Sequence, residues 1–430
     1  MPCHAKNGRQ NASRLADWKV GVTCSAGLPT GEFLGFRPGP APPESVSCAP
    51  RSRPAPASFP QSFEALSLLT FAVAHLFYIL PVIDTNQRLT AVLPQLQAAD
   101  WIAVDTEADS LHAYPEKLCL IQISLGGADL LIDPLSAMDL TSFWQVLRTH
   151  ELILHGADYD LRLLNKHCDF QPSAIFDTML ASRLLGNREF GLTSLVAQHL
   201  GAALEKGPQK ANWAQRPLTE RMEAYARNDT RYLKPLADIL KRQLLEKGRL
   251  TWHQESCARL ISDCVQIRPT DLDVVWRVKG SHQLGPVALG VLRELWHWRE
   301  KEAIAANKPP YFVLPPETMV EAALAAEAGR SSPDLLPRHL TQRRREGILQ
   351  AIAQGLALQK PPDVRRSRAY RQTESEKKRM QELEKRRDKR AVELGLDPTI
   401  IASRAMLVLL AQDWDEYNVD LMQWQRDLLQ

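Results

Sequence analysis

Short apolar segments alternate with longer periodic ones between Asp84 and about Leu245, and this alternation predicts an α/β domain. Three of the apolar segments are bounded by polar or glycine-containing turns, as neighbouring strands usually are: Trp101–Thr106, Leu118–Ser124 and Asp129–Ile132. Because strands come first and helices are interleaved later, we expect a mixed sheet in a domain at 84–267.

The remaining elements of this domain follow from the same patterns. Helical periodicity marks Leu140–Arg148 and Asp158–His167, and Leu218–Lys247 is the longest periodic stretch. A buried strand is expected at Leu152–His155, and the chain from Phe176 onward is expected to be largely helical. These segments predict helices packed around the sheet.

Only helical patterns remain after Ile267. Leu284–Ala306 predicts an amphipathic helix, and shorter helical patterns continue, so we expect a small all-α domain at 277–359. The segment at 365–430 begins with Arg365–Arg390, which holds twelve basic residues against five acidic ones and is by default a solvated charged helix. Apolar-periodic stretches follow, so this segment is either a second small domain or an amphipathic tail.

The N-terminal part of the chain has a different character. Residues 1–60 contain ten of the 29 prolines and six of the 21 glycines without a sustained hydrophobic period, so we expect a disordered extension. It lacks the pattern of a signal peptide. The lead-in at 61–83 contains the apolar run Ala65–Ile83, which is long enough for a membrane span. Its polar interruptions and Pro81 instead favour a helix and a strand, Phe77–Ile83, packed on the next domain.

The composition is that of an ordinary folded protein. Hydrophobic residues make up 44% and charged residues 24%, and the net charge of +3 says little about partners. The seven cysteines are scattered without CxxC spacing. This argues against a disulfide framework or a zinc site, and it favours a reducing, cytoplasmic compartment.

Asp105 and Glu107 lie two residues apart at the end of the first apolar strand. A spacing of two places both carboxylates on one face of a strand. Two acids on one face are costly unless a cation neutralises them, and oxygen-rich sites suit magnesium or manganese. The alternative is one acid in a turn and the other on an exposed face.

Further residues extend this pattern along the chain. Asp160 lies early in a helix, where it is either a first-turn acid favoured by the helix dipole or a site residue. Asp158 is nearer the helix start and fits the capping role better, which leaves Asp160 free for a site. Tyr225 and Asp229 are four residues apart, which places phenol and carboxylate on one helix face.

This order of motifs (DxE on a strand, Asp after a strand, YxxxD on a late helix) resembles the DEDD superfamily of 3′–5′ exonucleases, in the subgroup with tyrosine in the third motif. More specifically, the chain resembles the ribonuclease D family. Supporting segments are LCLIQIS at 118–124, FDTML at 176–180 and WAQRPL at 213–218. LRELWHWRE at 292–300 resembles the helicase-and-RNase-D C-terminal (HRDC) domain, and 370–430 resembles a divergent second copy.

The resemblance implies a ribonuclease H-like mixed-sheet exonuclease domain followed by one or two small all-α domains. It also implies two divalent metal ions, Mg²⁺ or Mn²⁺, held by Asp105, Glu107, Asp160 and Asp229. In the family's scheme Asp105 bridges both ions, Glu107 and Asp229 complete the site that activates water, and Asp160 helps to hold the second ion. Tyr225 orients the attacking water.

The implied activity is that of a metal-dependent 3′–5′ exoribonuclease, a monomer that trims RNA 3′ ends such as those of tRNA precursors and releases nucleoside 5′-monophosphates. Two alternatives stay open. One is a 3′–5′ DNA exonuclease, because the catalytic residues do not distinguish the sugars. The other is a non-catalytic nucleic-acid-binding protein, which the complete set of four acids and Tyr225 disfavours.

Weaker candidates for substrate binding surround the motifs. Leu111, with His112, is a candidate wedge against the terminal base, and Gln122 either reaches substrate or satisfies backbone groups. Trp213 and Arg216 are candidates for base stacking and phosphate pairing, with core packing as the alternative for Trp213.

Residues outside this set have simpler expectations. Arg338 and Arg343–Arg345 remain as candidate phosphate contacts in the helical part. His155 ends a buried strand and is expected to be a satisfied core histidine.

Overall fold

The structure, a computed structural model, describes the following residues: 78–79, 81–205, 207–266, 271, 274–330, 336–337, 340–360, 362 and 371–430. Several expectations lie outside the described residues: the extension at 1–60, most of the lead-in at 61–83, Arg338 and the start of the basic run at 365–370. Within the described ranges, no helix is long and apolar enough to cross a membrane.

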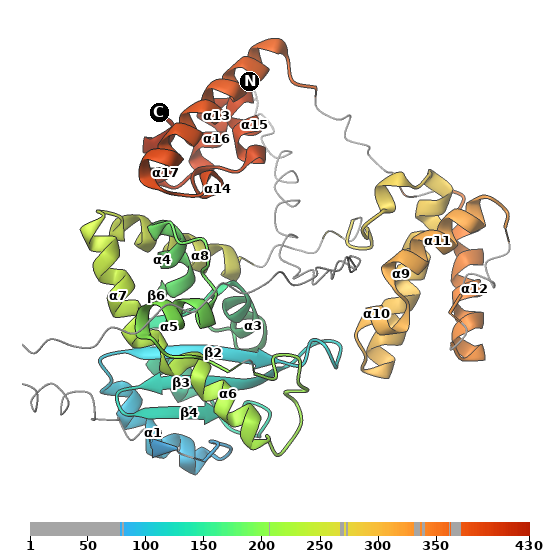
Figure 1. Ribbon diagram of the computed structural model, residues 1–430. Helices are drawn as coiled ribbons and strands as arrows, with labels where there is room; N and C mark the ends of the chain where they lie inside the picture. Colours follow the sequence, from blue (N-terminus) through green and yellow to red (C-terminus); the bar gives the residue numbers. More distant parts are fainter. Residues whose placement is uncertain are drawn as a thin grey trace, which may run out of the picture. The chain divides into compact units, whose positions relative to one another are not determined.

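Six strands form one sheet in the order β1-β4-β3-β2-β5-β6. Figure 1 labels β2, β3, β4 and β6 of this sheet. The strands are β1 (Tyr78–Ile79), β2 (Ile102–Ala108), β3 (Leu118–Leu125), β4 (Ala128–Ile132), β5 (Glu151–Leu154) and β6 (Ala174–Asp177). β3 pairs antiparallel with both β2 and β4, whereas β2, β5 and β6 run parallel, as do β1 and β4. The sheet is therefore mixed, as the order of elements predicts.

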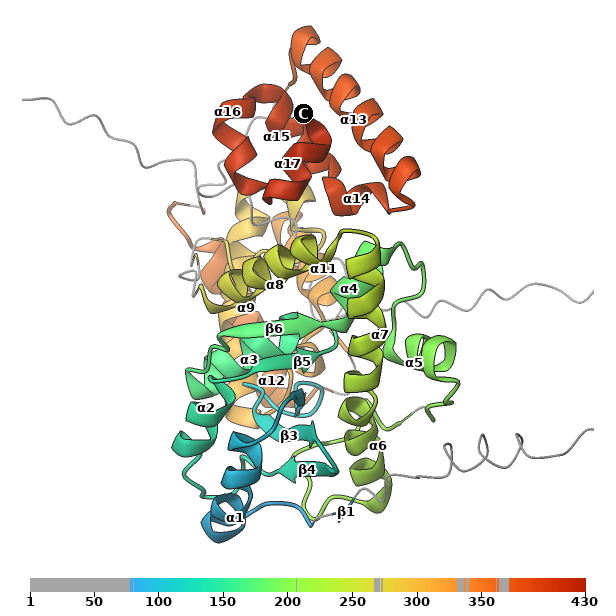
Figure 2. The same cartoon turned by 90° about the vertical axis from the view of Figure 1, so that its left-hand side faces the viewer.

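Helices cover both faces of this sheet. The helices of the α/β domain are α1 (Asn86–Gln97), α2 (Thr141–Leu147), α3 (Asp158–Cys168), α4 (Thr178–Leu185), α5 (Leu192–Leu200), α6 (Glu220–Arg231), α7 (Leu233–Glu246) and α8 (Leu250–Val265). In Figure 2, α1, α2 and α3 lie on one side of the sheet, and α6 and α7 lie on the other.

β2 shows how the two faces are used. Ile102 and Val104 belong to the core formed with α1, α2 and α3, whereas Ala103 belongs to the core that includes α7. Because side chains alternate along a strand, Asp105 and Glu107 continue the face of Ala103. The acids of the DxE motif thus point to the side of the sheet that α6 and α7 cover.

Two elements differ from the sequence expectation. β6 occupies Ala174–Asp177, whereas a largely helical chain was expected from Phe176. A four-residue strand that leads directly into a helix is too short for its hydrophobic periodicity to distinguish it from the helix. The stretch Leu218–Lys247 is two helices, because α6 ends at Arg231 and α7 begins at Leu233.

A separate group of helices follows the α/β domain: α9 (Pro286–Ala306), α10 (Pro310–Val313), α11 (Pro316–Glu327) and α12 (Gln342–Leu356). They share one core, which includes Trp276 and Leu292. The guanidinium groups of Arg343 and Arg344 pair with the Glu302 carboxylate on α9 at 2.7 and 3.3 Å. These arginines therefore have partners within the helical group, which weakens the expectation that they contact phosphates.

The C-terminal helices are α13 (Glu374–Leu394), α14 (Pro398–Ile401), α15 (Arg404–Gln412), α16 (Trp414–Tyr417) and α17 (Gln423–Leu429). Basic residues of α13 bind backbone carbonyls of the helices that follow. Arg379 donates to Ala411 at 2.7 Å, and the buried Arg387 donates to Ala402 at 3.1 Å. The expectation of a wholly solvated charged helix is wrong at these positions, because the arginines tie the segment into a small helical unit.

Candidate metal centre and active site

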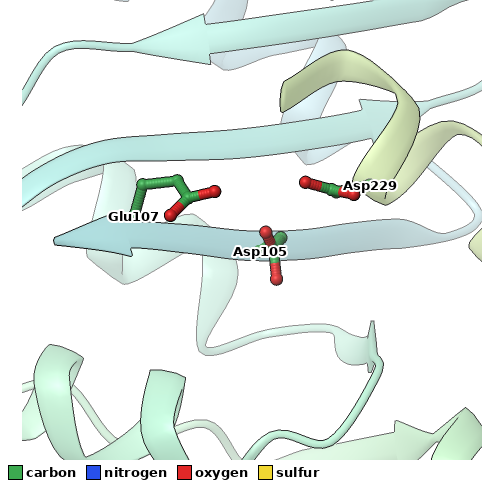
Figure 3. Close-up of side chains that lie close together, drawn as sticks. All are labelled: Asp105, Glu107 and Asp229. Carbon is green, nitrogen blue, oxygen red and sulfur yellow. The ribbon is translucent and has the colours of Figure 1, made fainter. Parts of the chain in front are cut away.

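Three carboxyl groups from two elements lie together on the α6 side of the sheet. One carboxylate oxygen from each of Asp105, Glu107 and Asp229 lies within 4.8 Å of the others. The first two come from β2 and the third from α6 (Figure 3). All three residues are partly exposed, so solvent and ions reach them. Oxygen ligands at this spacing fit a divalent cation.

A buried polar network places Asp229 by holding α6 against the sheet. The Asp129 carboxylate on β4 accepts from the Ser124 hydroxyl at 2.5 Å and from the Arg231 guanidinium at 2.6 Å. Arg227, within the YxxxD motif, donates to the backbone carbonyl of Asp129 at 2.5 Å. Because Arg227 and Arg231 flank Asp229 on both sides, these bonds fix the rotation of the helix that carries the acid.

Asp160 is the fourth acid, and it reaches the site from the opposite face of β2. It is the third residue of α3, is 6% exposed, and accepts from the Thr106 hydroxyl at 2.5 Å. Thr106 lies between Asp105 and Glu107, so strand alternation points it to the α3 side. Thr106 belongs to none of the acidic motifs, and its place on the other face of the DxE strand is the sequence signal that identifies it.

Asp158 does not cap α3, contrary to the expectation. The N-cap residue is Ala157, whose own side chain makes no capping hydrogen bond. Asp158 is the first residue of the helix and pairs with Arg162, one turn later, at 2.9 Å. The prediction that Asp160, and not Asp158, belongs to the site nevertheless has a physical basis, because Asp160 is buried close to the other acids.

Burial raises the pKa of all four carboxyl groups, and repulsion within the site adds to the shift for Asp105, Glu107 and Asp229. Burial, followed by the charges of the other three acids, raises the pKa of Asp105 well above its ordinary value. Burial and then the charges of Asp229 and Asp160 raise the pKa of Glu107 to about 9. Mainly through burial, the pKa of Asp160 rises to about 6 and that of Asp229 to about 7. A cation favours the charged form of every carboxylate around it, so this donor set fits a divalent metal.

Tyr225 lies next to these acids with its ring held from two sides. Its ring centroid is 6.1 Å from that of Trp213, and a Cβ atom at Gly207 would lie 1.5 Å from the ring. Its hydroxyl lies near the Asp229 carboxylate and the Gln209 side chain. Burial, followed by the charge of Asp229, raises the pKa of Tyr225 well above its ordinary value, so the phenol keeps its proton at neutral pH.

Gln122 contacts an acid, which neither alternative in the sequence analysis anticipated. It lies opposite Asp105 in the β2–β3 register, and its Nε2 donates to the Asp105 carboxylate at 3.3 Å. Its buried Oε1 has no hydrogen-bond partner within the part of the chain that the structure describes. Leu111 is 42% exposed in the loop after β2, where a contact with substrate is sterically open.

Trp213 and Arg216 do not offer the contacts expected of them. Trp213 is 1% exposed and packs in the core with Leu120 and Met222, so its ring has no free face for a base. Arg216 donates both to the Asp133 carboxylate, at 2.5 and 2.6 Å, and to three backbone carbonyls. An arginine has five N–H donors, and all five are used here. For Trp213 the packing alternative is correct. For Arg216 a structural role replaces the predicted phosphate pairing.

His155 has the internal partner expected of a core histidine. Its Nδ1 lies 2.8 Å from the Thr178 hydroxyl. Burial lowers the pKa of His155, so its ring stays neutral at pH 7.

Comparison with known proteins identifies the family. A family model described as 3′-5′ exonuclease matches residues 80–245, and an HRDC domain model matches 288–331. Ribonuclease D of Shewanella sp. (strain ANA-3) is 32% identical over 291 residues, which are 66% of this chain and 74% of that protein. The chain belongs to the ribonuclease D family. Ribonuclease D of Gluconacetobacter diazotrophicus is 31% identical, with 64% of this chain and 72% of that protein aligned.

Solved structures agree with this assignment at the level of the fold. The crystal structure of Escherichia coli RNase D superimposes with a TM-score of 0.61 at 23% identity, covering 78% of this chain and 91% of that one. The catalytic core of RRP6 from Trypanosoma brucei gives 0.55 at 25% identity, covering 64% of this chain and 79% of that one. The predictions of the family, of the fold class and of an exoribonuclease are confirmed, and the exonuclease fold of ribonuclease D implies a divalent metal.

Proposed function

We propose that this member of the ribonuclease D family removes nucleotides from the 3′ ends of RNA, tRNA precursors among them, and releases nucleoside 5′-monophosphates. The observation that carries the proposal is the cluster of Asp105, Glu107 and Asp229, with Asp160 buried beside it. Four carboxylates suit a pair of Mg²⁺ or Mn²⁺ ions, which would lower the pKa of bound water and stabilise the charge that develops on phosphate.

Each acid has a proposed place in holding these ions. Asp105 would help to hold both ions, because its carboxylate belongs to the cluster with Glu107 and Asp229 and lies close to Asp160. Glu107 and Asp229, on the same side of β2, would hold the ion near the attacking water. Asp160, on the α3 side, would hold the second ion, and its bond from Thr106 orients the carboxylate for that contact.

Tyr225 would orient the attacking water and not deprotonate it. Because its pKa is raised, the phenol is protonated at neutral pH and is a poor general base. Its hydroxyl lies near the Asp229 carboxylate, so it can bind a water held by the same carboxylate. Leu111, exposed after β2, is proposed to pack against the terminal base.

The helical parts are proposed to bind RNA upstream of the cleaved end. We propose domain boundaries at 84–267, 277–359 and 365–430, the second of which contains the HRDC match at 288–331. The third, with α13 to α17, is proposed as the divergent second copy. A monomer and a cytoplasmic location stay predictions from the sequence.

The rival activity is the same hydrolysis on DNA. The four acids and Tyr225 are compatible with both sugars, because discrimination needs a contact to the 2′-hydroxyl. The ribonuclease D names of the relatives favour RNA.

The test is digestion of 3′-extended RNA and of sequence-matched DNA, both labelled at the 5′ end, in Mg²⁺, in Mn²⁺ and in EDTA. We expect ladders that shorten one nucleotide at a time from the 3′ end of the RNA, nucleoside 5′-monophosphates as the only products, and no digestion in EDTA. Asp105→Asn should be inactive, and Asp100→Asn, an exposed aspartate just before β2, is the matched control that should keep wild-type rates. Internal cuts, 3′-monophosphate products or full activity in EDTA would contradict the proposal, and faster digestion of DNA would favour the rival.

A further inference from the structure

The start of α3, which carries Asp160, lacks a local cap. Its N-cap residue is Ala157, whose side chain offers no acceptor, and the preceding Gly156 has a left-handed φ of +71°. Unsatisfied N–H groups at a helix start normally need an acceptor. Here the acceptor comes from a distant part of the chain, the end of β6.

Asp177, the last residue of β6, is 1% exposed, and its carboxylate accepts four backbone N–H bonds. Its Oδ2 accepts from Ala157 at 2.8 Å, and its Oδ1 accepts from Gly156 at 3.1 Å. Oδ1 also accepts from Met179 at 2.8 Å and from Leu180 at 3.1 Å, which caps α4. One buried carboxylate thus joins the turn before α3 to the first turn of α4.

Two further contacts hold the same turn in the same place. The Thr178 hydroxyl lies 2.8 Å from Nδ1 of His155 and donates to the carbonyl of Leu154 at 3.1 Å. A Cβ atom at Gly156 would lie 2.6 Å from the Cε of Met179, so the turn packs directly on α4. Backbone and side-chain contacts therefore both fix the segment between the end of β5 and Asp160.

We propose that Asp177 and Thr178 are positioning residues for the reaction: they seat the turn 155–157 on α4 and so set where the Asp160 carboxylate stands relative to Asp105. The inference rests on the proposed metal-holding role of Asp160. Asp177 itself touches neither substrate nor the cluster of Asp105, Glu107 and Asp229; it acts through the backbone. Partners that orient metal ligands typically change metal affinity or activity about 10- to 100-fold when they are removed.

Asp177→Asn tests this with a minimal change. The amide oxygen can keep the three bonds now made by Oδ1, including both bonds that cap α4, while the amide nitrogen replaces Oδ2 and cannot accept from Ala157. The bond to the start of α3 is lost selectively. Thr178→Val removes the bridge from His155 to Leu154 without any change of charge.

The measurements use the full-length protein. The first is the Mg²⁺ concentration that gives half-maximal single-turnover cleavage of RNA; the second is the rise in melting temperature on titration with Mg²⁺ in the absence of RNA, which reports metal binding directly. We expect Asp177→Asn to raise the half-maximal Mg²⁺ concentration about tenfold or more. Thr178→Val should act in the same direction with a smaller effect, and both variants should need more Mg²⁺ for the same thermal shift.

Controls separate positioning from simple loss of stability. Val146→Ala shortens a buried side chain in α2 and should lower the melting temperature while leaving the Mg²⁺ requirement unchanged. Asp397→Asn makes the same chemical change at the N-cap of α14 and should also leave it unchanged. If Asp177→Asn and Thr178→Val shift the Mg²⁺ requirement no more than Val146→Ala, the two residues only cap a helix and the proposal is wrong. If Asp177→Asn does not fold, Thr178→Val decides.

Asp160→Asn distinguishes failure of this inference from failure of the proposed function. If Asp160→Asn is inactive while Asp177→Asn and Thr178→Val keep the wild-type Mg²⁺ requirement, the positioning inference is wrong but the proposed function stands. A wild-type Mg²⁺ requirement in Asp160→Asn would overturn the metal-holding role of Asp160 and, with it, the positioning role of Asp177.

Discussion

Glu107→Gln should stabilise the metal-free protein while abolishing its activity. The pKa of Glu107 rises from an ordinary 4.5 to about 9, because burial and then the charges of Asp229 and Asp160 disfavour its ionised form. At pH 7 the folded protein therefore keeps a proton that the unfolded chain has released. At 1.36 kcal/mol for each pH unit between 4.5 and 7, this difference costs folding about 3 kcal/mol. A glutamine carries no charge and avoids that cost.

The sign of the pH dependence follows from the direction of the shift. When a carboxyl group has a raised pKa in the folded state, the folded protein binds more protons than the unfolded chain, so stability falls as pH rises. The wild-type protein in EDTA should lose stability through the window from pH 4.5 to about 9. The advantage of Glu107→Gln should be absent near pH 4 and grow steadily across that window. A bound divalent cation removes the penalty, so Mg²⁺ should stabilise wild type more than the variant.

The assay is urea unfolding of both proteins in EDTA at intervals from pH 4 to 9, repeated in Mg²⁺. Glu116→Gln is the matched control with the opposite sign. Burial acts to raise the pKa of Glu116, but its bond from Lys166 prevails and lowers it, so this variant should be equally or slightly less stable at pH 7. If Glu107→Gln is less stable than wild type at pH 8 in EDTA, or if its advantage does not change with pH, the electrostatic reasoning about the site is refuted.

The remaining predictions concern catalysis and binding. Asp105→Asn should abolish hydrolysis while RNA binding persists, and a rate above about a tenth of wild type in Mg²⁺ would contradict its metal-holding role. Tyr225→Phe should slow single-turnover cleavage by about 10²–10⁴-fold with unchanged Mg²⁺ affinity, and an unchanged rate would make Tyr225 a packing residue. A chain that ends after Gln266 retains all four acids and should cleave short single-stranded oligonucleotides. On structured RNA, a plot of log binding constant against log salt concentration should become shallower, by about 0.7–0.9 for each phosphate that the shortened chain no longer neutralises.

The sequence predicts the acids of the site well because each motif is local. A spacing of two on a strand or of four on a helix determines a shared face without knowledge of the rest of the fold, and Asp105 and Glu107 share a face of β2 as their spacing predicts. Asp229 joins them in the structure. Their assembly into one cluster came from the resemblance to a family. No local rule brings a strand at position 105 and a helix at position 229 together.

What the sequence could not predict depends on long-range partners. Arg216 looks like a free cation in the sequence, yet its five donors are satisfied by Asp133 and by carbonyls that include one far along the chain. For Trp213 the sequence left stacking and core packing open, and the contacts with Met222 and Ala226 of α6 decide for packing. The bond from Gln122 to Asp105 requires the β2–β3 register, which periodicity alone does not specify.

The arrangement also gives a reason for the spacing of the DxE motif. β2 stands between two helices, and its alternation sends Asp105 and Glu107 toward α6 while Thr106 points to α3. Each helix then supplies one carboxylate, Asp229 from one side and Asp160 from the other. A motif with adjacent acids would place one of them on the wrong face and leave Asp160 without its hydroxyl partner. The middle residue is therefore part of the site: a small hydrogen-bond donor there couples the acid of α3 to the strand that carries the other two.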